Sequence, residues 1–292
     1  MTGPGARASC LFYVIGIVVH LCLAQSVRAD PADRPHRIVS MNMCTDHLAL
    51  MLADRADILS VTFSSADPGQ SLITDRLTGM VLNDGQAEQV LSLHPDLVLS
   101  GVLTTAYANR LLRELGLPVV EVPFPESLAD ARHNIRLVAR AIGVPERGER
   151  LIADLDQRVG QAVRERPAKS LSVLVLAAGG FTHGRHTIVD DLLTQAGLRN
   201  SAAELGIDHT RNIDLETVLR AAPDVIVFSR AGRLSHALAT GWLALPVLKK
   251  YTQAHKAVDV PSNYLGCETP YLGAALQMIV QGVREPGEEG AP

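Results

Sequence analysis

Two fourteen-residue segments, one in each half of the chain, have similar sequences; we call them the two copies of a repeated phrase. The segment at 88–101 reads EQVLSLHPDLVLSG, the segment at 216–229 reads ETVLRAAPDVIVFS, and the two align without a gap at five identities. Each copy predicts a short helix, a Pro-Asp turn and a buried strand. Such units are common in α/β folds, and five identities alone would not prove a repeat. The matching place of the unit in each half predicts two lobes of one architecture.

Strands and helices alternate through both halves. In the first half we expect strands at 37–41, 58–63, 97–101 and 117–122, and helices at 46–53 (capped by Thr45), 86–93 and 107–116. In the second half we expect strands at 170–178, 224–229 and 256–260, and helices at 187–197, 214–222, around 235–245 and from Pro270 onward. Several strands are continuous apolar runs, which is typical of a parallel sheet with helices on both faces. The sequence therefore predicts an α/β protein.

A long amphipathic helix is predicted between the halves. A capped helix at 127–143 is followed at once by a second at 145–167, whose apolar residues form one stripe. At 1.5 Å per residue the second helix would run roughly 30 Å, without a Gly-Ser linker. We expect an N-terminal lobe at 30–144, a bridging helix at 145–167, a C-terminal lobe at 168–284 and a disordered tail at 285–292.

The first 29 residues are typical of a secretory signal peptide. Arg7 precedes the apolar stretch 11–24, which is short for a membrane span, and Val27 and Ala29 form a small-residue cleavage site. We expect cleavage after Ala29 and a periplasmic protein; an uncleaved anchor and a lipoprotein at Cys22 are the weaker alternatives.

Cleavage would leave an acidic protein. Of 27 Lys and Arg and 31 Asp and Glu residues, the first 29 positions hold only Arg7 and Arg28, so 25 basic residues would face 31 acidic ones, a net charge of −6. Without a basic patch such a chain is a poor nucleic-acid binder. Cys44 and Cys267 are the two cysteines that remain.

The order of several segments resembles a known family. RIVSMNMCTD, VLSLHPDLVLSG, the helix at 145–167, GGFTHGRHTIVDDLLTQAG, DLETVLRAAPDVIVFS and PSNYLGCETPYLGAALQMI follow one another as in the helical-backbone substrate-binding proteins of ABC importers. The resemblance covers about 37–283 and implies two Rossmann-like lobes, each with a mostly parallel sheet, with a ligand cleft between them. It further implies a monomer without an intrinsic cofactor that delivers cobalamin, a ferric siderophore or haem to a permease dimer with its ATPase subunits.

The resemblance also gives the repeated phrase a role. Glu88 and Glu216 open its two copies, and a carboxylate at the start of a helix is favoured by the helix dipole. In the resembled family, paired glutamates dock onto arginines of the permease. Both simple capping and docking are compatible with these two positions.

Loops that follow predicted strands supply the expected ligand-binding residues, because ligands of open α/β sheets bind at the carboxyl ends of strands. We expect 42–46, 62–65, 83–85, 101–105, 180–186, 229–232 and 262–268 to converge on one groove. The candidates are Asn42, Met43, Cys44, Phe63, Ser64, Asn83, Asp84, Thr104, Phe181, His183, Arg185, His186, Arg230, Asn263, Tyr264, Cys267 and Glu268.

Two pairs among these candidates have several interpretations. Cys44 and Cys267 could form a disulfide between the lobes, face a metal-bearing ligand as thiolates, or be separate buried residues; an oxidising compartment favours the disulfide. His183 and His186 could ligate a metal or be ordinary solvated histidines. No HExxH helix supports a resident metal site, and we predict none.

The chemical identity of the ligand stays open at this stage. Few aromatic residues are available for a corrinoid wall, Arg185 and Arg230 suit a ferric siderophore, and His183, Tyr264 and Cys267 are potential haem ligands. No phosphate loop and no GxSxG motif is present. A secreted two-lobe α/β hydrolase and a receptor for a bare metal ion are the alternatives to a chelate receptor.

Overall fold

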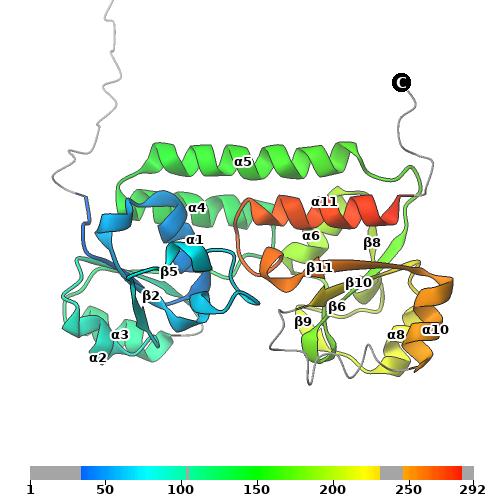
Figure 1. Cartoon of the computed structure of the whole chain (residues 1–292), viewed down its shortest axis with the longest axis horizontal. Coiled ribbons are helices and arrows are strands. Elements are labelled where there is room, and N and C mark those ends of the chain that lie inside the picture. Colours follow the sequence, from blue (N-terminus) through cyan, green and yellow to red (C-terminus); the bar gives the residue numbers. More distant parts are fainter. Residues whose placement is uncertain (1–33, 103–104, 231–245, 285–292) are drawn as a thin grey trace, which may run out of the picture.

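Two α/β lobes lie side by side beneath a long helix (Figure 1). The computed structural model describes residues 34–102, 105–230 and 246–284. The chain begins with the N-terminal lobe, runs through the helices α4 (Leu128–Ile142) and α5 (Pro145–Arg164), and then forms the C-terminal lobe. The predicted two-lobe α/β fold is thereby confirmed.

The N-terminal lobe is built on a five-stranded parallel sheet. Its strand order is β3-β2-β1-β4-β5, with β1 at Ile38–Ser40, β2 at Ile58–Thr62, β3 at Val81–Asn83, β4 at Leu97–Gly101 and β5 at Val119–Val122. Helices α1 (Met43–Leu52) and α4 pack on one face, whereas α2 (Ala87–Ser92) and α3 (Ala106–Glu114) cover the other. Successive residues of a strand point to opposite faces of the sheet, and the adjacent residues Ile38 and Val39 are both buried. Both faces of this sheet are therefore covered and apolar.

The C-terminal lobe contains a mixed sheet. Its strands are β6 (Ser172–Ala177), β7 (Phe181–His183), β8 (Arg199–Asn200), β9 (Thr210–Asn212), β10 (Val225–Arg230) and β11 (Lys256–Pro261), in the order β11-β10-β6-β7-β9 with β8 beside β6. β7 pairs antiparallel with β6 and β9, and the other pairs are parallel. α6 (Ile188–Gln195) and α11 (Tyr271–Val283) pack on one face; α7 (Ser201–Glu204), α8 (Leu215–Ala221) and α10 (Pro246–Ala254) pack on the other.

The repeated phrase has the same structural role in both lobes. Asp96 accepts hydrogen bonds from the backbone N–H groups of His36 and Arg37, at the start of the central strand β1. Asp224 accepts one from the N–H of Ser172, which begins the central strand β6, and a second from the Ser172 hydroxyl. The phrase is therefore a unit in which the Pro-Asp carboxylate fixes the start of the neighbouring central strand.

The turn before each Pro-Asp pair is also the same. The residue that precedes the proline is His94 in one copy and Ala222 in the other, and both have left-handed backbones, with φ of 48° and 41°. This conformation ends the helix and turns the chain toward the strand, although it strains a residue that has a Cβ.

The bridging helix is held by its neighbours at very short range. α5 packs against α4 and α11 (Figure 1), and all three contribute to one apolar core shared by the two lobes. A Cβ added at Gly148 would lie 2.5 Å from Ala139 Cβ, and one added at Gly273 would lie 2.4 Å from Arg158 Cβ. Gly148 and Gly273 therefore permit close packing of α5 against α4 and α11, respectively.

Three details differ from the expectations. Asn42, not Thr45, caps α1, so residues 43–46 lie in its first turn and not in a loop. The segment 179–187 contains β7, which pairs with β6 and β9. The helix expected around 235–245 lies outside the described residues, as do the segments predicted to be a signal peptide and a disordered tail. Within the described part of the chain, no helix is long and apolar enough to cross a membrane.

Candidate functional site

A pocket lies where the chain reverses its direction of travel across the N-terminal sheet. The chain builds β2 and β3 on one side of β1, and then β4 and β5 on the other, so the carboxyl ends of β1 and β4 flank a topological switch point. The pocket is lined by Asn42, Cys44, Thr45, Gly101, Val102, Val122, Pro123, Phe124, Pro125, Gly266 and Glu268. Gly266 and Glu268 come from the C-terminal part of the chain, so both parts contribute.

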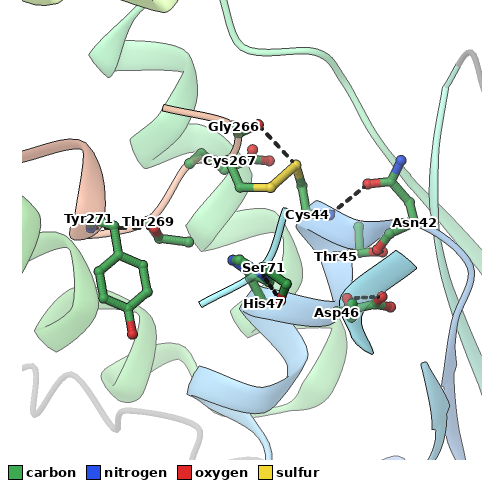
Figure 2. Close-up of a disulfide and its surroundings, with 12 residues drawn as sticks. Asn42, Cys44, Thr45, Asp46, His47, Ser71, Gly266, Cys267, Thr269 and Tyr271 are labelled. Carbon is green, nitrogen blue, oxygen red and sulfur yellow. Dashed lines mark hydrogen bonds between the residues drawn. A yellow bond between two sulfur atoms is a disulfide. The ribbon is translucent and has the colours of Figure 1, made fainter. Parts of the chain in front are cut away.

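A disulfide between Cys44 and Cys267 forms part of this region (Figure 2). Cys44 lies in the first turn of α1, where its backbone N–H is bound by the Asn42 side chain at 2.9 Å. Cys267 is buried in the segment that leads into α11. The Cα atoms are 5.1 Å apart, although 223 residues separate the two cysteines in sequence. The bond therefore joins the two lobes beside the pocket.

Three phenylalanines near strand ends are unusually exposed. Phe63 follows β2, Phe124 lies shortly after β5 and Phe181 begins β7, and their exposed fractions are 61%, 68% and 45%. Phe124 also lines the pocket. Large aromatic side chains left in solvent at the edge of a cleft are typical of a site that becomes covered by an apolar ligand.

One carboxyl group is buried in the pocket wall. Glu268 is 2% exposed, and its Oε1 accepts a hydrogen bond of 3.2 Å from the Asn134 side-chain amide of α4. Burial raises the pKa of Glu268 above its ordinary value, which favours the neutral acid. Asn134 also donates to the carbonyl oxygen of Pro123, so one amide positions both the carboxyl group and the pocket wall.

Comparisons with known proteins place this architecture. The model of the periplasmic binding protein family matches residues 38–239, more than half of the chain. The chain belongs to this family.

Relatives of this periplasmic binding protein include a sequence and several solved structures. The uncharacterized ABC transporter substrate-binding lipoprotein YvrC of Bacillus subtilis (strain 168) is 24% identical over an alignment of 263 residues, which covers 85% of this chain and 80% of the relative. The apo structure of the periplasmic heme-binding protein RhuT from Roseiflexus sp. RS-1 is 28% identical, with a TM-score of 0.71 over 85% of this chain and 97% of RhuT. The periplasmic vitamin B12 binding protein BtuF of Vibrio cholerae shares the fold at 20% identity, with a TM-score of 0.67 over 85% and 96%. The predicted family is confirmed, and the predicted role, solute binding for an ABC importer, is supported.

Only some expected ligand-binding residues of this binding protein line the pocket. Asn42, Cys44 and Glu268 do so. Met43 begins α1, Cys267 is buried behind the pocket as the partner of Cys44, and Phe63 and Ser64 lie in the short 3₁₀ turn after β2. Thr104 and the side chain of Arg230 lie outside the described residues.

Asn83 and Asp84 form hydrogen bonds within the N-terminal lobe and do not line the pocket. The buried Asn83 amide donates to the Ser40 carbonyl oxygen and the Ser60 hydroxyl, and its oxygen accepts from the Gly85 N–H. Asp84 is exposed and accepts from the Gln86 side chain and backbone. Polar residues after a strand can tie strands together as readily as they bind ligands.

Asp46 holds α1 to the end of β2. Its Oδ2 accepts from the Thr62 N–H and hydroxyl and from the Ser65 hydroxyl, and burial raises its pKa to about 6. The adjacent His47 bonds to the Ser71 hydroxyl, and burial lowers its pKa to about 4 (Figure 2).

The candidates of the C-terminal lobe are dispersed. His183 bonds to the Thr210 hydroxyl, and burial lowers its pKa to about 4. Arg185 forms an ion pair with Asp208 at 2.8 Å. His186 Nδ1 lies 3.8 Å from a carboxylate oxygen of Glu126, across the lobe boundary. Phe181 is an exposed aromatic residue at the start of β7.

Of the remaining two candidates, only Asn263 has a contact across the lobe boundary among these interactions, because its amide donates to the Pro68 carbonyl oxygen. Tyr264 packs edge-on against Tyr271 of its own lobe. Within the described residues, no group of three or more His, Cys, Asp or Glu side chains is arranged to hold a metal ion.

Sequence reasoning missed several residues of the pocket. Pro123, Phe124 and Pro125 are pocket residues in none of the expected loops, and Asn134 was missed as the partner of Glu268. Val102 lies in the expected loop 101–105 but was not named as a candidate. The three residues 123–125 follow the end of β5, so the rule that selected the other loops would have found them. Asn134 gives no such signal, because it lies inside a helix.

Proposed function

We propose that this chain is the solute-binding component of an ABC importer and that its solute is a large, flat metal chelate, a haem or a corrinoid. The observation that carries the proposal is the exposure of three aromatic side chains, Phe63, Phe124 and Phe181, of which Phe124 lines the pocket at the switch point. A flat macrocycle would cover aromatic surface that water now contacts, and about 25 cal/mol per Å² of buried apolar area would favour binding.

The relatives support the importer role and this ligand class. RhuT is described as heme-binding and BtuF as vitamin B12 binding, and YvrC is described as an ABC transporter substrate-binding lipoprotein. The family is one of binding proteins, which gives the hydrolase alternative no support. A bare-metal receptor is disfavoured because the described residues offer no cluster of metal ligands.

The ligand class is tested by recovering the solute and then by titration. The protein is purified from its own extracytoplasmic compartment and analysed by native mass spectrometry; haemin and cobalamin are then titrated separately into the unliganded protein. We expect one macrocycle to copurify, and Phe124→Ala to weaken its binding about tenfold. Tyr107→Ala, which removes an equally exposed aromatic residue outside the pocket lining, should bind normally. If neither macrocycle binds, the proposal is wrong.

Permease docking is proposed for the two glutamates of the repeated phrase. Glu88 and Glu216 are exposed in the first turns of α2 and α8, and both helices lie on the side of the molecule away from α5 (Figure 1). One acid per lobe suits a two-fold permease, together with its ATPase subunits. The double variant Glu88→Gln/Glu216→Gln should keep ligand affinity and stability but lose most uptake. The control Glu114→Gln/Glu204→Gln, on other exposed helix positions, should transport normally.

The cellular setting follows from the same proposal. The chain is exported, its signal peptide is removed after Ala29, and it acts in the periplasm as a monomer with no resident cofactor. Intact-mass measurement of the exported protein tests the cleavage site. A mass that includes a lipid on Cys22 would instead assign a lipoprotein.

A further inference from the structure

The wall of the pocket contains an acid and, among its described lining residues, no basic side chain. Glu268 is the one ionisable group that lines it, besides the disulfide-bonded Cys44. The other polar side chains of the lining are those of Asn42 and Thr45, and the rest are glycine, proline, valine and phenylalanine. Any polar group that a ligand brings here therefore meets a carboxyl group and uncharged partners.

The carboxyl group interacts with the Asn134 amide and with its own backbone N–H, and no cation is paired with it among the described residues. Asn134 donates to its Oε1, and no salt bridge to Glu268 is formed by the described residues. A buried charge without a paired cation is costly, so burial shifts this group toward the neutral acid. Asn134 lies in α4, and the second hydrogen bond of its side-chain amide, to the Pro123 carbonyl oxygen, holds this donor in place.

Whether Glu268 is protonated or ionised, its carboxyl group in this setting distinguishes a ligand amide from a ligand carboxylate. As the neutral acid, it can donate its O–H to an amide carbonyl while its other oxygen accepts from the amide N–H, which satisfies both partners. A carboxylate of the ligand would receive one hydrogen bond but no compensating positive charge in a desolvated wall. If Glu268 were ionised, it would repel the carboxylate outright.

We infer that Glu268, positioned by Asn134, is a specificity-determining residue that selects macrocycles with carboxamide groups at the edge facing this wall over macrocycles with carboxylates there. This inference rests on the proposed function and sharpens it. It favours an amide-bearing corrinoid over haem, whose polar edge carries two propionates.

A pair of matched corrins tests the selection on the full exported protein. Dicyanocobinamide carries carboxamide side chains, and dicyanocobyrinic acid carries carboxylates on the same ring. Equilibrium titration at pH 7 should give at least about tenfold tighter binding of the amide corrin, since an unmet buried charge costs more than an ordinary hydrogen bond provides. Equal or tighter binding of the carboxylate corrin overturns the inference, and this comparison needs no variant.

Two variants then assign the selection to Glu268. Glu268→Gln keeps an uncharged hydrogen-bonding group of the same size and should retain the tenfold ratio. Glu268→Met removes the polar group at similar size and should reduce the ratio to threefold or less, with the amide corrin losing affinity. A Met variant that keeps the full ratio overturns the assignment. Glu268→Gln is expected to fold, and a collapse of the ratio in this variant would also overturn it.

A control separates this wall from general negative charge. Glu126→Gln removes an exposed acid at the lobe boundary, and it should leave the ratio unchanged; a fall as large as that of Glu268→Met would refute the role of Glu268. Failure of the proposed function is distinguishable, because then neither corrin nor haemin binds. If haemin binds and the corrins do not, the proposed function stands and this inference is wrong.

Discussion

The two lobes contain the same helix–Pro-Asp–strand unit, yet they build different sheets around it. In the N-terminal lobe, Asp96 fixes the start of β1 within an all-parallel sheet. In the C-terminal lobe, Asp224 fixes the start of β6, but β7 and β9 extend that sheet in the antiparallel direction. Nine of the eleven pocket residues come from the N-terminal lobe. The repeat therefore records a shared architecture, whereas the pocket depends on what differs.

The largest expected effect comes from breaking the covalent connection between the lobes. Cys44→Ala/Cys267→Ala should lower the free energy of unfolding by several kcal/mol, and the chain-entropy relation gives about 5 kcal/mol for a loop of this length. Denaturant unfolding measures it. The double variant should be indifferent to thiol reductants, whereas the wild-type protein should approach it when reduced. Equal stability of the two would show that the lobe interface alone supplies the connection.

The second effect concerns how the lobes respond to acid. Asp46 has a pKa raised to about 6, so the folded state holds an extra proton between pH 4 and 6, and stability falls as the pH rises through that window. His47 and His183 have pKa values lowered to about 4, so stability rises with pH between 4 and 6.5. Asp46 and His47 oppose one another in α1, whereas His183 is unopposed in β7.

Variants separate these contributions. Asp46→Asn should make stability rise more steeply between pH 4 and 6, by roughly 1.4 kcal/mol per pH unit. His183→Gln should flatten the dependence. Urea unfolding at pH 4.5, 5.5 and 6.5 gives both slopes. Parallel curves for Asp46→Asn and the wild type would contradict the proposed balance in α1.

The third test compares the two strand-fixing carboxylates. Asp96→Ala and Asp224→Ala should each lower the free energy of unfolding by about 1–3 kcal/mol, because each carboxylate accepts two hydrogen bonds. The loss should be larger for Asp224, whose partner Ser172 is buried. Asp75→Ala, at an exposed position, is the control. A negligible loss at one site only would mean that the two carboxylates do not make equivalent contributions to stability.

The smallest effect concerns the left-handed turns. His94→Gly and Ala222→Gly should each stabilise the protein by about 0.5–1 kcal/mol, because glycine adopts a positive φ without Cβ strain. Ala221→Gly, one position earlier and inside α8, should instead destabilise it by a similar amount. Thermal melts distinguish the signs. Destabilisation by both turn variants would show that the side chains matter more than the strain.

Local signals predicted the parts of the fold that depend on local chemistry. Ser127 and Asp130 indicate the start of α4, and the Ser127 hydroxyl does accept from the Asp130 N–H. The start of α1 was misplaced because Asn42 and Thr45 both suit a cap, and only the fold shows that Asn42 binds the Cys44 N–H. Local pattern thus locates a helix more reliably than it chooses between adjacent caps.

Contacts between distant segments set the limit of prediction. β7 and β9 are three-residue strands whose pairing exists only because 181–183 meets 210–212 in space. The separation of Cys44 and Cys267, and the burial of Glu268 against Asn134, likewise come from tertiary structure. Composition suggested few aromatics for a ligand wall, and the structure shows that one of them, Phe124, lines the pocket.

The disulfide has a consequence for the order in which the molecule is completed. A chain that enters an oxidising compartment with its N-terminus first presents the Cys44 thiol early, but its partner arrives only after 223 further residues have followed. Until then this bond cannot form, and a product truncated before Cys267 never acquires it. Oxidation of this pair therefore marks a chain that extends at least through Cys267, and a thiol-labelling assay would separate such molecules from shorter ones.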